Sequence, residues 1–181
     1  MGADKALLEF CGTRMVDLVA HKLATLTDRI VVVARRRHQI GTIACSVIED
    51  ERPFAGPLAA LIAGLRATAA ETNLVVACDM PFLNVALLER LAELAGDDVD
   101  AVVPVTRTGP EPLHAAYRDC ALEPLLASVA GGMRSLRGAI EHMRVRWISE
   151  AEWRPLDPEG RSFINVNTPE EFRAAAEVAI G

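Results

Sequence analysis

Charged side chains follow several apolar runs of this sequence, and their types suit the binding of phosphates and metal ions. Asp79 comes directly after the run at residues 74–78, and Asp50 follows the run at 44–48. Lys5 lies in a polar stretch close to Met1. In open α/β sheets, ligands bind beyond the carboxyl ends of the strands. A single carboxylate at such an end suits a Mg²⁺ ion carried on the phosphates of a nucleotide.

Two further groups of residues lie at similar positions. The pair Gly56-Pro57 also follows the apolar run at 44–48, and Asn165 and Asn167 flank Val166 before the last predicted helix. Each has a structural alternative, because lysine is often solvated, aspartate forms turns and asparagine caps helices. Their shared place at strand ends is a stronger indication of function than any one residue.

The sequence lacks the common phosphate-binding fingerprints, a zinc site and a nucleophile pair for covalent catalysis. There is neither a G-x-x-x-x-G-K-[ST] nor a G-x-G-x-x-G motif, and no His/Cys set has the spacing of a zinc site. His114 has no nearby Cys or Ser arranged as a nucleophile pair. The residues therefore favour positioned charges, which is what phosphoryl and nucleotidyl transfer require.

Apolar periodicity predicts the elements that would position these residues. Strands are expected at 29–34, 44–48, 74–78, 100–105, 111–117, 145–148 and 163–166. Helices are expected at 16–26, 57–65, 87–94, 119–130 and 134–142 and from Thr168 onward. Alternating strands and helices predict a three-layer α/β/α sandwich with a mostly parallel sheet.

Composition places the chain in a broad class. Its 181 residues fit one domain with a sizeable core, residues 1–181. The net charge of −6 argues against a nucleic-acid partner. No apolar run is long enough for a membrane span, and no signal peptide is recognisable, so we expect no membrane partner and a cytoplasmic protein.

Six motifs in series carry a resemblance to a known family. They are Met1-Gly2-x-Asp4-Lys5-Ala6, Ile48-Glu49-Asp50, Gly56-Pro57-Leu58-Ala59, Cys78-Asp79-Met80-Pro81-Phe82-Leu83, Glu111-Pro112-Leu113-His114-Ala115 and Asn165-Val166-Asn167-Thr168-Pro169-Glu170. In this order the chain resembles the molybdenum cofactor guanylyltransferase family, the MobA-like nucleotidyltransferases, from Met1 to the last helix. Any one motif alone is weak.

The resemblance implies a Rossmann-like nucleotidyltransferase fold and a Mg²⁺-dependent enzyme. The reaction would transfer GMP from GTP to the molybdopterin (molybdenum) cofactor, giving the guanine dinucleotide cofactor and pyrophosphate. Alternatives within the class are a CTP:molybdopterin transferase and a guanylyltransferase acting on a phospho-acid. The family also implies molybdoenzyme chaperones as partners.

The same resemblance assigns roles to individual residues. Lys5 and Asp79 would be catalytic, with Asp79 holding the metal. The nucleotide would be bound by Gly2, Lys5, Asp50, Gly56, Pro57 and Asp79. The pterin side would be lined by His114, Arg134, Ser135, Asn165 and Asn167.

One departure from the family lies at the beginning of the chain. Family members begin with a strand and a glycine-rich loop of the form Leu-Ala-Gly-Gly-x-x-x-Arg-Met-Gly, whereas this sequence starts at the Met-Gly of that pattern. Lack of a central strand predicts two neighbouring strands with unpaired edges. Three interpretations stay open: an N-terminally truncated form of a longer enzyme, a catalytically weak paralogue that acts as a binding module, and a rearranged sheet.

Overall fold

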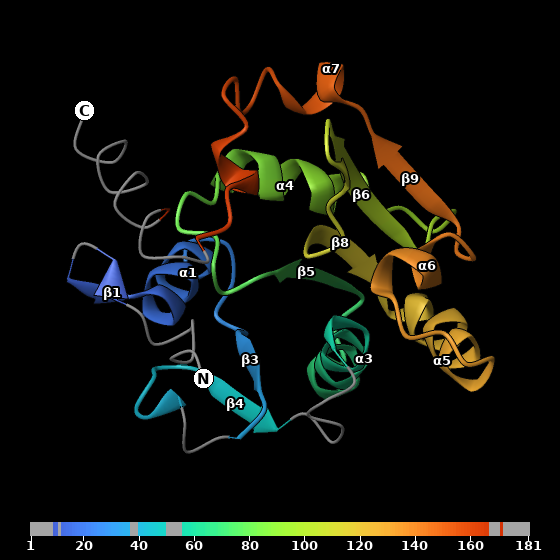
Figure 1. Cartoon of the computed structure of the whole chain (residues 1–181), viewed down its shortest axis with the longest axis horizontal. Coiled ribbons are helices and arrows are strands. Elements are labelled where there is room, and N and C mark those ends of the chain that lie inside the picture. Colours follow the sequence, from blue (N-terminus) through green and yellow to red (C-terminus); the bar gives the residue numbers. More distant parts are fainter. Residues whose placement is uncertain (1–8, 11, 37–39, 50–55, 167–170, 172–181) are drawn as a thin grey trace.

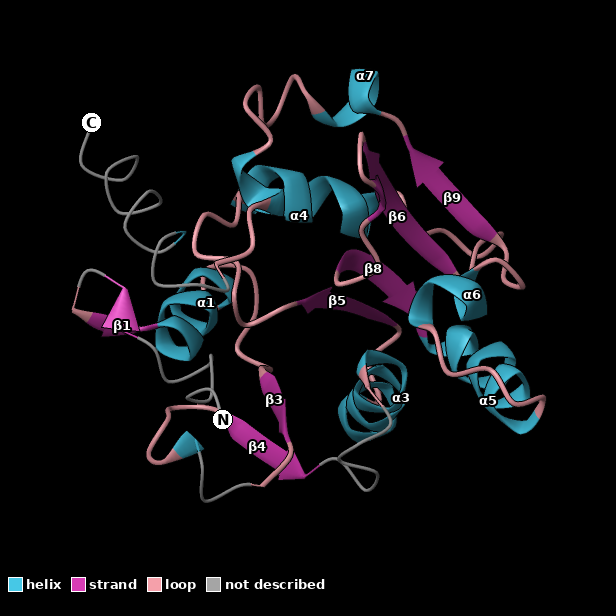
Figure 2. Ribbon diagram, viewed as in Figure 1, coloured by secondary structure: helices cyan, strands magenta, loops and turns pink. Residues whose placement is uncertain are grey.

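The computed structural model describes residues 9–10, 12–36, 40–49, 56–166 and 171. Its strands are β1 (Glu9–Phe10), β2 (Thr13–Arg14), β3 (Val31–Ala34), β4 (Ser46–Glu49), β5 (Thr72–Val76), β6 (Ala101–Thr106), β7 (Gly109–Pro110), β8 (His114–Arg118) and β9 (Val145–Ile148). Its α-helices are α1 (Met15–Leu23), α3 (Pro57–Thr68), α4 (Val85–Glu93), α5 (Leu122–Ala130), α6 (Leu136–Ile140) and α7 (Glu150–Trp153). Two 3₁₀ turns are η2 (Asp119–Ala121) and η3 (Arg161–Phe163). Figure 2 shows strands and helices following one another along most of this length.

The strands of the main sheet bury both faces. In β6, Ala101 and Val103 pack into one core with α3, α5 and α6, whereas Val102 between them packs into a second core with α4. β8 alternates in the same way, as the two-residue period of a strand requires. Figure 1 shows α3, α5 and α6 on one side of β5, β8 and β6, with α4 on the other. The described chain therefore has the three layers that the sequence predicts.

The direction of the strands differs from the prediction. β5–β8, β8–β6, β6–β7 and β1–β2 are antiparallel, and only β6–β9 and β3–β4 are parallel. A mostly parallel sheet is thus wrong for the described strands. The reason lies between β6 and β8, where residues 107–113 are too few for the crossover of about a dozen residues that a parallel pair needs. The chain turns back instead, through Gly109 with φ +112°.

The described strands also form separate sheets. β5, β6, β7, β8 and β9 belong to one, while β3 and β4 form a two-stranded sheet of their own. Among the described residues no backbone hydrogen bond joins β3 to β5. Val31 to Val33 and Leu74 to Val76 are only half-buried. Among the described residues, one edge of β3 and one edge of β5 therefore have no strand partner.

Most other elements lie close to where the sequence places them. The strands predicted at 29–34 and 100–105 appear as β3 and β6, and β9 has the predicted bounds. The predicted strand at 163–166 is wrong, because Arg161–Phe163 is a 3₁₀ turn. The final predicted helix lies outside the described residues except for Glu171. Within the described part of the chain, no helix has the length and apolar character needed to cross a bilayer.

In the described part of the chain β3 pairs with β4 alone, and this predicts a pattern of amide exchange. The amide of Ser46 donates to the carbonyl of Ile30 at 3.2 Å, and Val31 is in register with Ser46. In a parallel ladder the amide of Val32 then faces β4, and the amides of Val31 and Val33 face away. We expect those two amides to exchange at least about tenfold faster than that of Val32 in NMR hydrogen exchange. Equal protection of all three would contradict an unpaired edge.

Candidate active site

Asp79 lies in a turn just beyond the carboxyl end of β5, as predicted. The strand ends at Val76, and Cys78 and Asp79 form the turn. The next residues are anchored, since Met80 and Leu83 are 2 % and 3 % exposed and pack against α1 and α4. Asp79 itself is half-buried. Its carboxylate therefore sits on a short segment with fixed ends.

A lysine from α1 holds the far end of the same segment. Nζ of Lys22 donates to the carbonyl oxygen of Leu83 at 3.0 Å. Partial burial lowers the pKa of Lys22 below its ordinary value. The positive side chain thereby fixes the residues that follow Asp79 against the first described helix.

The predicted residue Asn165 lies on a segment that reaches the Asp79 turn. The amide of Val166 donates to the carbonyl oxygen of Asp79 at 2.9 Å, and the Val166 side chain is 2 % exposed. The neighbouring Asn165 is exposed. The structure therefore brings together the segments that carry Asp79 and Asn165, while the role of each side chain stays a prediction.

Gly56 and Pro57 begin α3, as the sequence predicts for this pair. Gly56 has φ +76° and ψ −167°, a conformation that is strained for any residue with a Cβ. Pro57 takes the first helical position, where its missing N–H is not needed. The first turn of α3 contains no acidic side chain. The partial positive charge at this helix start suits the close backbone approach expected of the turn.

His114 occupies an unexpected place for a residue on the pterin side. It is the first residue of β8, is 0 % exposed, and its two ring nitrogens have no hydrogen-bond partner in the described chain. Its ring contacts Phe163 edge-to-face, with centroids 5.0 Å apart. Burial lowers the pKa of His114 to about 4, against a smaller opposing effect of Asp157. In this structure His114 packs as a neutral core residue.

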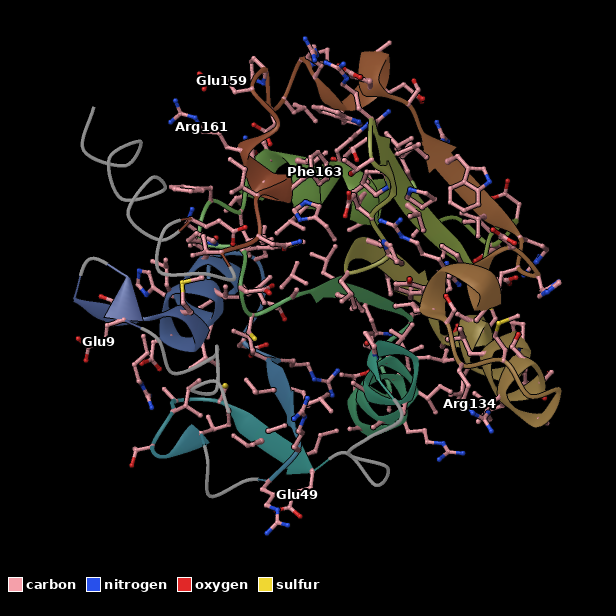
Figure 3. All side chains as sticks on the ribbon, viewed as in Figure 1. Glu9, Glu49, Arg134, Glu159, Arg161 and Phe163 are labelled. Atoms are coloured by element: carbon pink, nitrogen blue, oxygen red, sulfur yellow. The ribbon has the colours of Figure 1, made fainter. Side chains whose placement is uncertain are left out.

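Arg134 and Ser135 lie elsewhere, between α5 and α6. Ser135 caps α6 by accepting a hydrogen bond from the amide of Gly138 at 3.3 Å. Arg134 is exposed and donates to the carbonyl of Met133 at 3.2 Å. Figure 3 shows Arg134 beside α5, well separated from Phe163. The structure therefore does not gather Arg134 with His114, and a pterin role for Arg134 and Ser135 stays a prediction.

Four predicted site residues lie outside the described residues. They are Gly2, Lys5, Asp50 and Asn167. Their predicted contacts with nucleotide and pterin therefore stay predictions.

Sequence reasoning missed two buried polar residues that support the segment following Asp79. Asp157 and Ser162 are 5 % and 0 % exposed, and Ser162 accepts a hydrogen bond from the amide of Asn84 at 2.8 Å. Asn84 in turn caps α4, because its side chain accepts a hydrogen bond from the amide of Leu87 at 3.1 Å. The available signal was the turn-forming sequence from Asp157 to Gly160, which indicates a turn but not its partner.

The donor chemistry around Asp79 fits a magnesium ion better than a protein-enclosed metal. Among the described residues no group of three or more His, Cys, Asp or Glu side chains can hold a metal ion. Mg²⁺ is commonly bound by one or two carboxylates with the remaining ligands from phosphates and water. A half-buried carboxylate on an anchored turn meets that requirement.

The architecture itself defines a class of protein. The structure superposes with a TM-score of 0.74 on 2-C-methyl-D-erythritol 4-phosphate cytidylyltransferase from Thermus thermophilus, covering 99% of this chain and 95% of that one at 16% identity. It superposes with a TM-score of 0.82 on molybdopterin-guanine dinucleotide biosynthesis protein A from Archaeoglobus fulgidus, covering 97% and 90% at 30% identity. The chain therefore has an α/β nucleotidyltransferase fold.

Sequence comparison identifies the family within that class. The chain is 34% identical to a molybdenum cofactor guanylyltransferase of Desulfosudis oleivorans, over 99% of this chain and 88% of that protein. The family model of the MobA-like NTP transferase domain matches residues 1–150. The chain belongs to the MobA-like NTP transferase family, and the resemblance drawn from its motifs is confirmed.

The burial of His114 predicts how stability depends on pH. Its pKa of about 4 in the folded chain lies below the ordinary value of 6.5, so the unfolded chain binds a proton that the folded chain does not. The stability contributed by neutral His114 is complete above pH 6.5 and is lost as the pH falls toward 4, by roughly 3 kcal/mol. We expect His114→Leu to unfold in urea with a shallower dependence on pH across this window.

The exposed His142 supplies the control for this experiment. His142→Leu should keep the pH dependence of the parent chain, because it leaves the buried His114 in place. Identical slopes for His114→Leu and the parent chain would contradict a neutral buried His114.

Proposed function

We propose that the chain transfers the guanylyl group of GTP to the molybdopterin cofactor, releasing pyrophosphate. The observation that carries the proposal is the anchored turn with Asp79, hydrogen-bonded to the segment of Asn165, in a chain of the MobA-like family. The printed names of the relatives from Desulfosudis oleivorans and Archaeoglobus fulgidus support the choice of guanylate and pterin. We further propose that residues 1–181 form one domain that works in the cytoplasm.

The residues of the chain would act by binding and orienting two charged substrates. Asp79 would hold Mg²⁺, which supplies charge neutralisation at the α-phosphate and on the leaving pyrophosphate. Lys5 would add a positive charge near the phosphates, and Asp50 with the Gly56-Pro57 turn would hold the nucleoside. The pterin side would be bound by the segment of Asn165 and Asn167, with His114, Arg134 and Ser135 as further candidates.

No strong general base is required for this reaction. The nucleophile would be the terminal phosphate of molybdopterin, which is already charged at neutral pH. What the protein must provide is in-line alignment of that phosphate with the α-phosphate of GTP. Rigid anchoring of the Asp79 turn by Met80 and Leu83 serves this requirement.

A second candidate function is favoured by the edges of β3 and β5 that have no strand partner among the described residues. A nucleotide- or partner-binding module without transfer activity would not depend on the described strands forming one continuous sheet. Molybdoenzyme chaperones are the partners that we would expect for either candidate. Within the enzyme class, transfer of cytidylate to molybdopterin and of guanylate to a phospho-acid remain the alternatives.

Loss of the Asp79 carboxylate tests the catalytic proposal. We expect Asp79→Asn to lower the rate of guanylyl transfer by about a thousandfold, since a metal ion supplies several kcal/mol of charge stabilisation in the transition state. Cooperative unfolding and the circular dichroism spectrum should be retained. The exposed Asp98 gives the control, and Asp98→Asn should transfer at the parent rate. An active Asp79→Asn would refute the assignment of Asp79.

Nucleotide selectivity separates the candidate functions. Calorimetric titration of the parent chain with Mg·GTP and then with Mg·CTP should show binding of GTP only. Preference for CTP would favour the cytidylyl alternative. Binding of GTP without transfer to molybdopterin would favour the nucleotide-binding module. Binding of neither nucleotide would contradict guanylyl transfer and leave only the partner-binding module.

A further inference from the structure

Residues 156–166 are joined to the segment Asp79–Asn84 by hydrogen bonds at both ends of that segment. At one end, the amide of Val166 donates to the carbonyl of Asp79 at 2.9 Å. At the other, Ser162 Oγ accepts from the amide of Asn84 at 2.8 Å and donates to the carbonyl of Phe82 at 3.5 Å. The side-chain amide of Asn84 also donates to the carbonyl of Leu156 at 2.8 Å.

Asp157 builds the turn that presents Ser162. Its two carboxylate oxygens accept from the amides of Arg161 at 3.1 Å and Ser162 at 2.8 Å. Gly160 closes the turn with φ +65°, and its amide donates to the carbonyl of Asp157 at 3.0 Å. Charged acceptors of this kind form stronger hydrogen bonds than neutral ones. The orientation of the Ser162 hydroxyl therefore depends on Asp157.

These contacts join the two parts of the candidate site, the Asp79 turn and the segment of Asn165. Between the two bonded ends, Met80 is buried, so the Asp79 turn has little freedom to move alone. The segment that holds it continues from Ser162 through Asn165 to Val166. A shift of Ser162 would move the Asp79 turn relative to Asn165.

We propose that Ser162, oriented by Asp157, is a positioning residue. It fixes the Asp79 carboxylate, which would hold the metal, relative to the segment of Asn165, which would bind the pterin. Its role in transfer rests on the proposed function, whereas the coupling of the two segments does not. In this role Ser162 touches neither substrate and acts through the backbone of residues 79–84. The competing interpretation is that Asp157 and Ser162 contribute only to stability.

The decisive variants are Ser162→Ala and Asp157→Asn, with Asp100→Asn as the matched control. Asp100 is as deeply buried as Asp157, at 6 % against 5 % exposed, and accepts hydrogen bonds from Arg144. Asp100 directly precedes β6. Val105, whose carbonyl accepts a hydrogen bond from Trp153, lies at the opposite end of that strand. Asp100→Asn therefore reports the effect of losing a buried carboxylate outside the Asp79 network.

Amide hydrogen exchange of the full chain is the first measurement, and it needs no substrate. We expect the amides of Asn84 and Val166 to exchange at least about tenfold faster in Ser162→Ala and Asp157→Asn and to be unchanged in Asp100→Asn. Ser162→Thr, which keeps the hydroxyl, should restore the parent rates. Unchanged exchange in both variants, or the same increase in Asp100→Asn, would overturn the proposal.

The concentration of Mg²⁺ that half-saturates transfer is the second measurement. It should rise at least about tenfold in Ser162→Ala and Asp157→Asn but not in Asp100→Asn, even where the thermal midpoints fall equally. A role in stability alone would lower the midpoint without changing the requirement for Mg²⁺. If the parent chain transfers no guanylate, the proposed function fails, and the exchange rates alone decide whether Ser162 couples the two segments.

Discussion

The two-residue alternation of small and branched apolar side chains in β6 and β8 is the constraint on which the rest of the structure depends. Because Ala101 and Val103 face one way and Val102 the other, each face of the sheet requires its own layer of helices. Helices that cover both faces leave only the ends of the strands for polar groups. The position of Asp79 beyond β5 follows from this layering rather than from any property of the aspartate.

Local patterns were sufficient to predict most of the longer elements and several of their ends. The apolar run of β3 is continuous, as is that of β6 from Ala101 to Val105, and in β9 only Arg146 interrupts it. The direction of β8 was not accessible in this way. It depends on the length of the connection from β6 and on pairing with β5, which is distant in sequence. Propensity carries no information on either.

The sequence predicted the site residues whose position depends on the end of a strand. It did not predict those whose position depends on burial by distant parts of the chain. Asp79 and Gly56 lie at the ends that the sequence indicates. The burial of His114 was not indicated, because a strand that begins at His114 gives no local sign of what covers its first side chain. Ser162 was missed for a related reason, since its partners lie 78 and 80 residues away in the chain.

The buried His114 and Asp157 show why the segment before Asn165 is well supported. Asp157 would favour a charged His114, yet burial outweighs it and keeps the imidazole neutral. Both oxygens of Asp157 already accept backbone amides, so its charge is compensated by the turn itself. The neutral ring is then free to pack edge-to-face on Phe163, which packs in the same way on Trp153. Because Trp153 also donates to the carbonyl of Val105 at 3.0 Å, the turn that precedes Asn165 is linked through Phe163 and Trp153 to β6.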